Sequence, residues 1–145
     1  MPLTHIVVAL DGSASADKAL ELAVDLAGTY RARLTLLAVV PPATVPTYGG
    51  PAFEPISQAS LEAVYDDVLA TRKARVHDPR ISKLETVRRE GVIVEEIVAY
   101  LEQTHPDLLL VGSRGLSTGQ RIFLGSVSDT LTHHSPCPVL VVRHR

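Results

Sequence analysis

Residues 6–13 read Ile-Val-Val-Ala-Leu-Asp-Gly-Ser, an apolar run that ends abruptly in an acid, a glycine and a serine. The run from Ile6 to Leu10 does not alternate with polar residues, which is typical of a strand buried on both faces of a parallel sheet. Similar apolar runs occupy 34–40, with one break, 108–111 and 139–142. The sequence therefore predicts a sheet of buried, parallel strands.

Segments of helical period separate these runs. Small and branched apolar residues recur at helical spacing within 19–27 and again within 94–101. Alternating strands and helices predict an α/β fold, because parallel strands must be joined by crossover connections. Segment 83–89 is much more polar than the other strands, so we expect it at a sheet edge. The expected strands are 3–10, 33–40, 83–89, 107–112 and 138–143, and the expected helices are 14–28, 56–77, 92–104 and 125–134.

Length and composition point to one domain, residues 1–145. The chain carries 14 Lys and Arg against 16 Asp and Glu, a net charge of −2, which argues against a dedicated nucleic-acid binder. The apolar runs are too short to span a membrane, and the beginning of the chain lacks the features of a signal peptide. A single cysteine, Cys137, agrees with a reducing compartment. We therefore expect no membrane partner and a cytoplasmic location.

The segment 41–55 contains five prolines and the pair Gly49-Gly50, a composition that resists regular structure. It is expected to be a surface loop. It could act as a passive connector or as a mobile flap over a ligand, and the sequence leaves both readings open.

The stretch 111–126 is rich in glycine and leaves a buried strand to enter a helix near Ser126. In open parallel sheets, ligands bind at this end of the strands. Gly112 and Gly115 would let backbone amides approach phosphate oxygens, and Gly125 with Ser126 would present the free amides of a helix start. Two cationic side chains, Arg114 and Arg121, would add hydrogen-bond donors.

The spacing Gly112-x2-Gly115-x9-Gly125-Ser126 resembles that of ATP-binding members of the universal stress protein family. The opening 6–13 and the closing Pro136-Cys137-Pro138 with its apolar strand also resemble the family, so the resemblance covers the whole chain. It implies a Rossmann-like fold of the adenine nucleotide alpha hydrolase type. That fold is an open five-stranded parallel sheet of order 3-2-1-4-5, with helices on both faces. It also implies a homodimer with one ATP per subunit.

The resemblance assigns individual roles. Asp11 matches an acidic residue near the ribose that reaches the phosphates through metal or water, and Val39 matches a position whose backbone pairs with the adenine edge. Ala9 stands where many members have proline, and Gly91 stands where the family has a glycine. The phosphate loop is matched by Gly112, Gly115, Gly125 and Ser126.

Two of these residues have a structural alternative. An acidic residue after a strand often forms a local turn or caps the next helix, which could be the role of Asp11. A serine at a helix start, as at Ser126, is an ordinary cap as well. Mg²⁺ is expected with the triphosphate, and Asp11 is the one carboxylate candidate in the loops identified.

Other chemistries fit the sequence poorly. A phosphate-binding loop of the Gly-x4-Gly-Lys type needs a lysine, and the chain has lysines only at 18, 73 and 83. Neither a dinucleotide fingerprint after 3–10 nor the nucleophile elbow of a serine hydrolase is present. His133, His134 and Cys137 lie close in sequence but lack a fourth ligand and a recognised zinc spacing.

The sequence thus predicts an ATP-binding, dimeric stress-response module that changes its partner surface with nucleotide occupancy. The apolar edge strand 138–143, with Val139 and Val141, is expected to pair across the dimer. A slow ATPase or phosphotransferase and a nucleotide-free dimeric scaffold are the alternatives. No catalytic base is visible, so enzymatic activity beyond weak ATP hydrolysis is not expected.

Overall fold

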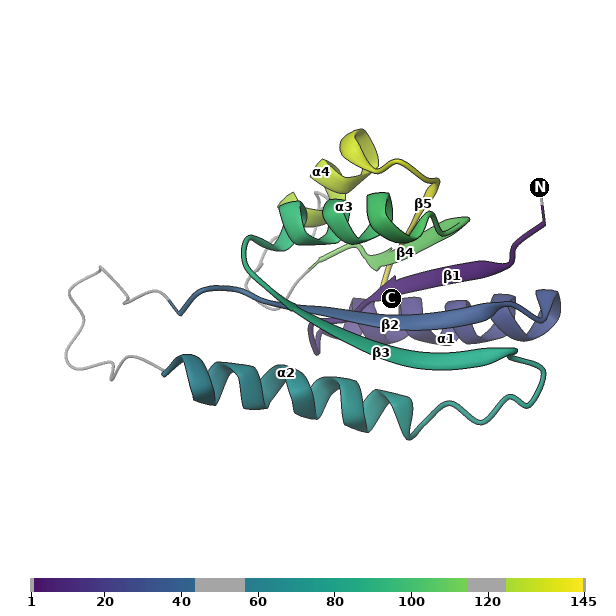
Figure 1. The fold of residues 1–145 in the computed structure, drawn as a ribbon, viewed down its shortest axis with the longest axis horizontal. Coiled ribbons are helices and arrows are strands. Elements are labelled where there is room, and N and C mark those ends of the chain that lie inside the picture. Colours follow the sequence, from purple (N-terminus) through teal and green to yellow (C-terminus); the bar gives the residue numbers. More distant parts are fainter. Residues whose placement is uncertain (1, 44–56, 115–124, 145) are drawn as a thin grey trace.

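The computed structural model describes residues 2–43, 57–114 and 125–144, and its centre is a five-stranded, all-parallel sheet (Figure 1). The strand order is β3-β2-β1-β4-β5, which confirms the order that the family resemblance implied. From β1 the chain adds β2 and β3 on one side, and it then crosses to the other side of β1 to form β4 and β5. A topological switch point therefore lies at the carboxyl ends of β1 and β4. The strands are β1 (His5–Ala9), β2 (Arg33–Val40), β3 (Lys83–Glu90), β4 (Leu108–Gly112) and β5 (Val139–Val142).

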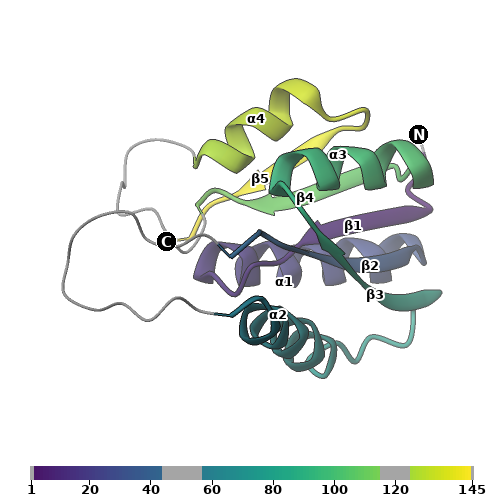
Figure 2. The same cartoon turned by 60° about the vertical axis from the view of Figure 1, so that its left-hand side comes forward.

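Four helices cover the two faces of the sheet in pairs. One face packs against α1 (Ala14–Tyr30) and α2 (Gln58–Lys73), and the other against α3 (Ile93–Thr104) and α4 (Ser126–His134). Figures 1 and 2 show these two helical layers on opposite sides of the strands. Such a three-layer arrangement buries both faces of every central strand.

The position of β1 at the centre of the sheet explains why the sequence of this strand is continuously apolar. Ile6 and Val8 pack into the cluster beneath α1 and α2, whereas Val7 packs into the cluster beneath α3 and α4. All three side chains are fully buried. Successive strand residues point to opposite faces, so a strand covered on both sides requires apolar residues at each position.

The two edge strands differ in character. Along β3 the exposed positions carry polar or charged side chains, including Lys83 and Arg88. The strand order places β3 at an edge of the sheet, which confirms the position predicted for 83–89. Charge discourages pairing with another sheet edge. The other edge, β5, is wholly apolar, and Leu140 is 37% exposed.

The expected element boundaries are close to those observed, with one larger difference. Helix α2 ends at Lys73, whereas the sequence predicted a helix to residue 77. The next amides turn tightly, with Arg75 N–H donating to Arg72 O and Val76 N–H to Lys73 O. Pro79 lies just beyond, and proline disfavours helical backbone in the preceding residue.

Within the described ranges, no helix combines the length and apolar character needed to cross a membrane. Most of the segment 41–55, for which a connector and a flap were both considered, lies outside the described residues.

Candidate functional site

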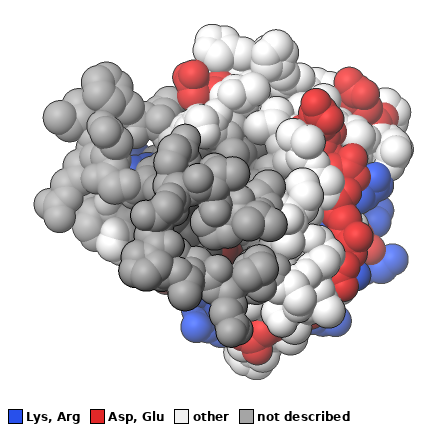
Figure 3. Space-filling model, turned by 90° about the vertical axis from the view of Figure 1, so that its left-hand side faces the viewer, with Lys and Arg blue, Asp and Glu red and all other residues white. Residues whose placement is uncertain are grey.

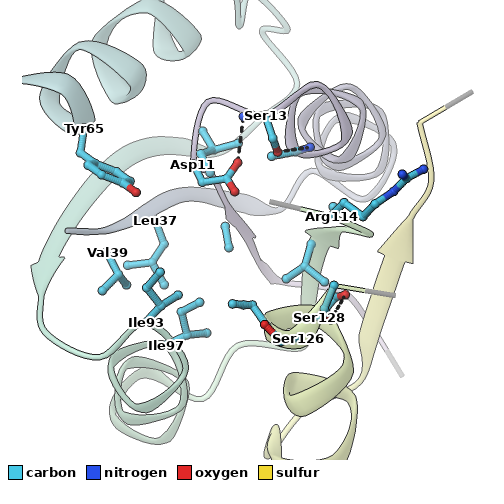
Figure 4. Close-up of a pocket in the computed structure, with 17 residues that line it drawn as sticks. Asp11, Ser13, Leu37, Val39, Tyr65, Ile93, Ile97, Arg114, Ser126 and Ser128 are labelled. Atoms are coloured by element: carbon cyan, nitrogen blue, oxygen red, sulfur yellow. Dashed lines mark hydrogen bonds between the residues drawn. The ribbon is translucent and has the colours of Figure 1, made fainter. Parts of the chain in front are cut away.

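An open cleft of about 690 Å³ lies at the carboxyl ends of β1, β2 and β4 (Figure 4). Its walls come from the turn after β1 and from one side each of α2, α3 and α4. Figure 3 looks toward this end of the molecule, and acidic and basic side chains are interleaved along one margin of the described surface. The cleft lies where open parallel sheets bind ligands.

One end of the cleft is apolar. Leu37 and Val39 of β2 form one wall, and Ile93 and Ile97 of α3 form another (Figure 4). Val39 and Ile97 are almost fully buried. This end can accept a flat, apolar-faced group, with backbone polar groups of β2 at its border.

Asp11 lies in the turn that leaves β1, and its orientation is fixed locally. Its Oδ1 accepts a hydrogen bond from Ser13 N–H at 2.8 Å, and Gly12 between them adopts a positive φ of 87°. Ser13 in turn caps α1, because its side chain accepts from Ala16 N–H at 3.2 Å. In the described part of the chain, Asp11 Oδ2 has no hydrogen-bond partner. Asp11 therefore makes the expected local turn and also lines the cleft.

Gly112 ends β4 at a point where α1 approaches very closely. A Cβ built on Gly112 would lie 2.5 Å from Ala16 N and 2.5 Å from Ser15 Oγ. Real Cβ atoms do not approach backbone so closely, so packing against α1 requires glycine here. Gly112 lines the cleft as expected, but helix-to-strand packing was not the reason given from the sequence.

Two buried hydroxyl groups hold the described ends of the chain on either side of 115–124. Ser15 Oγ donates to Arg114 O at 2.6 Å and accepts from Arg114 N–H at 3.2 Å. On the returning side, Ser128 Oγ contacts Ser113 O at 3.2 Å and Gly125 O at 3.0 Å. Both serines are almost fully buried. Sequence analysis did not single them out, because the first contact joins residues 99 positions apart.

Gly125 differs from its expected role. Its N–H donates to Ser113 O at 2.6 Å, so this amide is already engaged. The first helical bond of α4 runs from Asp129 N–H to Gly125 O. The amides at the helix start are therefore those of Ser126, Val127 and Ser128, and the positive end of the helix dipole lies beside the cleft.

Arg114 also lines the cleft, and Figure 4 shows its side chain extending toward β5. Ser126 is an exposed residue at the first position of α4, where Gly125 rather than Ser126 is the cap. Gly91 follows β3 and adopts a φ of 139°, with its N–H bonded to Val40 O at 3.0 Å. It is not among the residues that line the cleft.

The structure thus places the described candidate residues around one cleft. They are Ala9, Asp11, Val39, Gly112, Arg114, Gly125 and Ser126. Gly115 and Arg121 lie outside the described residues. Among the residues that the structure describes, no group of three or more His, Cys, Asp or Glu side chains could hold a metal ion.

Tyr65 of α2 is a cleft residue that sequence reasoning missed. Its ring enters the cavity from the side opposite α4, and its hydroxyl is turned toward Asp11 (Figure 4). Burial, followed by the negative charge of Asp11, raises the pKa of Tyr65 above its ordinary value. The available signal was the spacing Tyr65, Val68, Leu69, Arg72, which places these residues on one helix face.

The sheet order and the helix start beside the switch-point cleft define a Rossmann-like α/β protein with an open cleft at the carboxyl ends of its strands. The sequence profile of the universal stress protein family matches residues 2–143. Universal stress protein YxiE of Bacillus subtilis is 32% identical over 145 residues, covering 95% of this chain and 97% of that protein. The chain therefore belongs to the universal stress protein family.

Solved structures agree with this assignment. The universal stress protein UspA from Lactobacillus plantarum has a TM-score of 0.83 and 30% identity, with 99% of each chain covered. A universal stress protein crystallised in complex with cAMP has a TM-score of 0.70 and 26% identity, with 100% of each chain covered. A family member of this fold thus binds an adenine nucleotide.

Proposed function

We propose that this protein binds ATP in the cleft at the carboxyl ends of its strands and acts as a nucleotide-dependent, dimeric regulatory module. The observation that carries the proposal is the polarity of the cleft. An apolar end formed by Leu37, Val39 and Ile97 faces a polar end formed by the first turn of α4. A nucleotide has the same division between base and phosphates. The cAMP complex of a similar family member supports the proposal.

The base would occupy the apolar end, with its edge beside the backbone of Val39. The phosphates would lie at the start of α4, where the amides of Ser126, Val127 and Ser128 and the helix dipole favour an anion. Asp11 lies on the opposite side of the cleft from Ile97 and Ser126 (Figure 4). Each part of ATP thereby faces a chemically matched wall.

Mg²⁺ would accompany the triphosphate rather than occupy a separate protein site. This cation is normally held by phosphates, waters and one or two carboxylates. Asp11 is the acidic side chain that lines the described cleft, and its Oδ2 is available to a water of the hydrated ion. In that position Mg²⁺ would neutralise phosphate charge beside the carboxylate.

The described lining favours binding over rapid phosphoryl transfer. Its titratable side chains are Asp11, Tyr65 and Arg114, and neither a histidine nor a lysine lines the described part of the cleft. Fast transfer requires a residue that activates or orients the attacking group. We expect no more than weak ATP hydrolysis, to be measured as ADP formed during a long incubation.

Calorimetric titration with Mg-ATP tests the proposal, with Ser126→Glu as the decisive variant. A negative charge at the first position of α4 favours the helix dipole but repels phosphates, so the fold should persist while ATP binding falls at least about tenfold. Thr132→Glu adds the same charge at an exposed position near the other end of α4 and serves as the control. No heat with the wild type, and no nucleotide released on denaturing the purified protein, would instead support the nucleotide-free scaffold.

The dimer is proposed to form through β5. This strand is short, apolar and at an edge, and two copies could pair antiparallel across a two-fold axis. Val139 and Val141 are half-buried and pack against the cluster beneath α3 and α4. Val141→Glu should yield a monomer by sedimentation. Leu140→Glu, at a more exposed position of the same strand, should do so with less damage to the core, and a wild-type dimer in both variants would move the interface elsewhere.

A further inference from the structure

The face of α2 that packs on the rest of the molecule carries an unusual combination of side chains. Val68 and Leu69 are 7% and 6% exposed and join the core beneath α1 and α2. Tyr65 and Arg72 flank them on the same face, one turn to each side. The helix therefore presents a phenol and a guanidinium toward the sheet, with two apolar residues between them.

Arg72 anchors this face to the first turn of α1 and contacts the turn that precedes it. Its Nε and Nη2 contact Asp17 Oδ1 and Oδ2 at 2.9 and 3.1 Å, a two-point ion pair, and Nη2 lies 3.5 Å from Gly12 O. The Arg72 side chain is only 14% exposed. The hydrogen bond with Asp17 is the main reason why the pKa of Arg72 is raised. Paired, planar geometry of this kind fixes orientation as well as distance.

This anchor sets the position of Tyr65 relative to Asp11. Asp11 precedes Gly12, which Arg72 contacts, and Tyr65 lies two helical turns before Arg72 on the same face. Figure 4 shows the Tyr65 hydroxyl pointing from α2 into the cleft, toward the turn that carries Asp11. The two groups thus belong to one braced unit, although they come from different elements.

Both groups retain hydrogen-bonding capacity toward the cleft. Within residues 2–43, 57–114 and 125–144, neither the Tyr65 hydroxyl nor Asp11 Oδ2 has a hydrogen-bond partner. A phenol can donate and accept one hydrogen bond each way, whereas a carboxylate only accepts. A tyrosine phenol is protonated at neutral pH and can donate, and the raised pKa of Tyr65 is consistent with this.

A sugar hydroxyl matches this pair better than either of the other two parts of a nucleotide. Asp11 repels phosphate, and the described phosphate-favouring amides lie at α4. The base is expected at the apolar end, where Leu37 and Ile97 offer no hydrogen bonds. A hydroxyl can donate to the carboxylate and also exchange a hydrogen bond with the phenol.

We propose that Tyr65 is a further sugar-binding residue, and that its hydroxyl bonds a ribose hydroxyl of a bound nucleotide beside Asp11, the residue that the family resemblance already places near the ribose. This inference rests on the proposed nucleotide-binding function and adds to it a residue that favours ribonucleotides over deoxyribonucleotides. A site built to hydrogen-bond a ligand hydroxyl rejects the analogue that lacks it, because its own polar groups are then left unpaired.

The test is a calorimetric titration of three nucleotides, Mg-ATP, Mg-2′-deoxyATP and Mg-3′-deoxyATP, into three proteins. These are the wild type, Tyr65→Phe and Tyr30→Phe. Phenylalanine retains the ring of Tyr65 that packs against the core and removes only its hydroxyl. Tyr30 is 52% exposed at the far end of α1, so Tyr30→Phe removes a hydroxyl away from the cleft and serves as the matched control.

We expect Tyr65→Phe to bind ATP about five- to tenfold more weakly than the wild type, as for one lost hydrogen bond. For the deoxynucleotide that lacks the contacted hydroxyl, wild type and Tyr65→Phe should bind equally, so that the ribose preference falls in the variant. Tyr30→Phe should match the wild type throughout.

The two levels of the proposal fail in different ways. If the wild type binds ATP and Tyr65→Phe keeps the same affinities and the same ribose preference, the role of Tyr65 is wrong and the nucleotide site stands. A uniform loss for all three nucleotides in Tyr65→Phe likewise contradicts a sugar contact. If the wild type binds none of the three nucleotides, the proposed function fails together with the inference.

Discussion

The two ends of the sheet contrast in how their polar side chains are satisfied. At the amino end, His5 Nε2 and Thr35 Oγ1 are 2.8 Å apart, and Thr35 Oγ1 lies 2.8 Å from Glu85 Oε1, which also pairs with Arg33. At the carboxyl end, Asp11 Oδ2 and the Tyr65 hydroxyl face an open cleft. A parallel sheet has two such ends, and in this protein the amino end is closed by its own side chains.

A second group at the amino end strengthens the contrast. Asp107 Oδ2 accepts hydrogen bonds from the Thr4 amide and hydroxyl, each at 2.8 Å, and from His5 N–H at 3.0 Å. These bonds, led by that of the Thr4 amide, lower the pKa of Asp107. Polar groups that satisfy each other's hydrogen bonds stabilise the fold, whereas polar groups without a hydrogen-bond partner in the protein can bind a ligand. Substitutions at the two ends should therefore change different properties.

The largest effect is expected for Thr35→Val at the amino end. The Thr35 side chain is fully buried, and valine has nearly its shape but cannot bridge His5 and Glu85. Glu85 Oε1 keeps its pair with Arg33, but the buried His5 Nε2 loses its partner, which should lower the free energy of unfolding by about 2 kcal/mol, measured by urea denaturation. ATP affinity should stay at the wild-type value. Thr35→Ser keeps the hydroxyl, so its free energy of unfolding should fall by about half as much. An equal decrease in both variants would assign the effect to packing.

Asp11→Asn should show the opposite pattern. Asparagine can still accept the Ser13 N–H, so the turn and the free energy of unfolding should be nearly unchanged. Removing the negative charge should weaken Mg-ATP binding about tenfold, because hydrogen bonds to a charged group contribute more than neutral ones. Calorimetry and urea denaturation on the same preparation separate the two quantities. A variant with wild-type affinity would show that Asp11 serves the turn alone.

Ser15→Ala tests a residue that belongs to both categories. The Ser15 hydroxyl is satisfied, as at the amino end, but its partner is the backbone of Arg114 at the rim of the cleft. We expect a loss of about 1 kcal/mol in the free energy of unfolding and a two- to fivefold weaker affinity for ATP, on the order of one hydrogen bond. Ser60→Ala, an exposed serine near the start of α2, is the control. A change in stability without any change in affinity would make Ser15 a purely structural residue.

The smallest effect is a pH dependence at the amino end. Burial, and next the positive charge of Arg33, lower the pKa of His5 below its ordinary value of 6.5, against the opposing charges of Glu85 and Asp107. The unfolded chain therefore binds a proton before the folded protein does as the pH falls below 6.5, so the free energy of unfolding should decrease there. His5→Gln should remove this part of the decrease between pH 7.5 and 5.5. An identical pH profile in the variant would exclude His5 as its source.

Much of the fold was accessible to sequence reasoning because the signals were local. The bounds of β2 were predicted correctly, since an apolar run with one break that ends at two prolines allows few alternatives. The polar edge strand β3 was also predicted correctly from its charges. Helix α2 was predicted too long, because the turns that follow Lys73 are formed by backbone hydrogen bonds that the sequence did not reveal.

The site was predicted unevenly for the same reason. Asp11, Gly112 and Gly125 all line the cleft. They could be identified from glycine spacing and from the ends of buried strands, because both are local signals in the sequence. The close approach of α1 to Gly112 and the engaged amide of Gly125 depend on distant segments, and no local pattern encodes them. Tyr65 was missed because half-buried aromatic residues on an amphipathic helix normally belong to the core.

The sequence alone established the layers of this protein and the end of the sheet where a ligand should bind. Its apolar runs, helical period and glycine spacing were sufficient for this, because they arise from interactions between near neighbours in the chain. Which side chains meet there was settled by packing. The ion pair between Arg72 of α2 and Asp17 of α1 joins these two helices beside the turn after β1, and Tyr65 of α2 lies across the cleft from Asp11. Contacts between elements depend on the angle and distance at which they pack, and these are properties of the assembled core that no single segment carries.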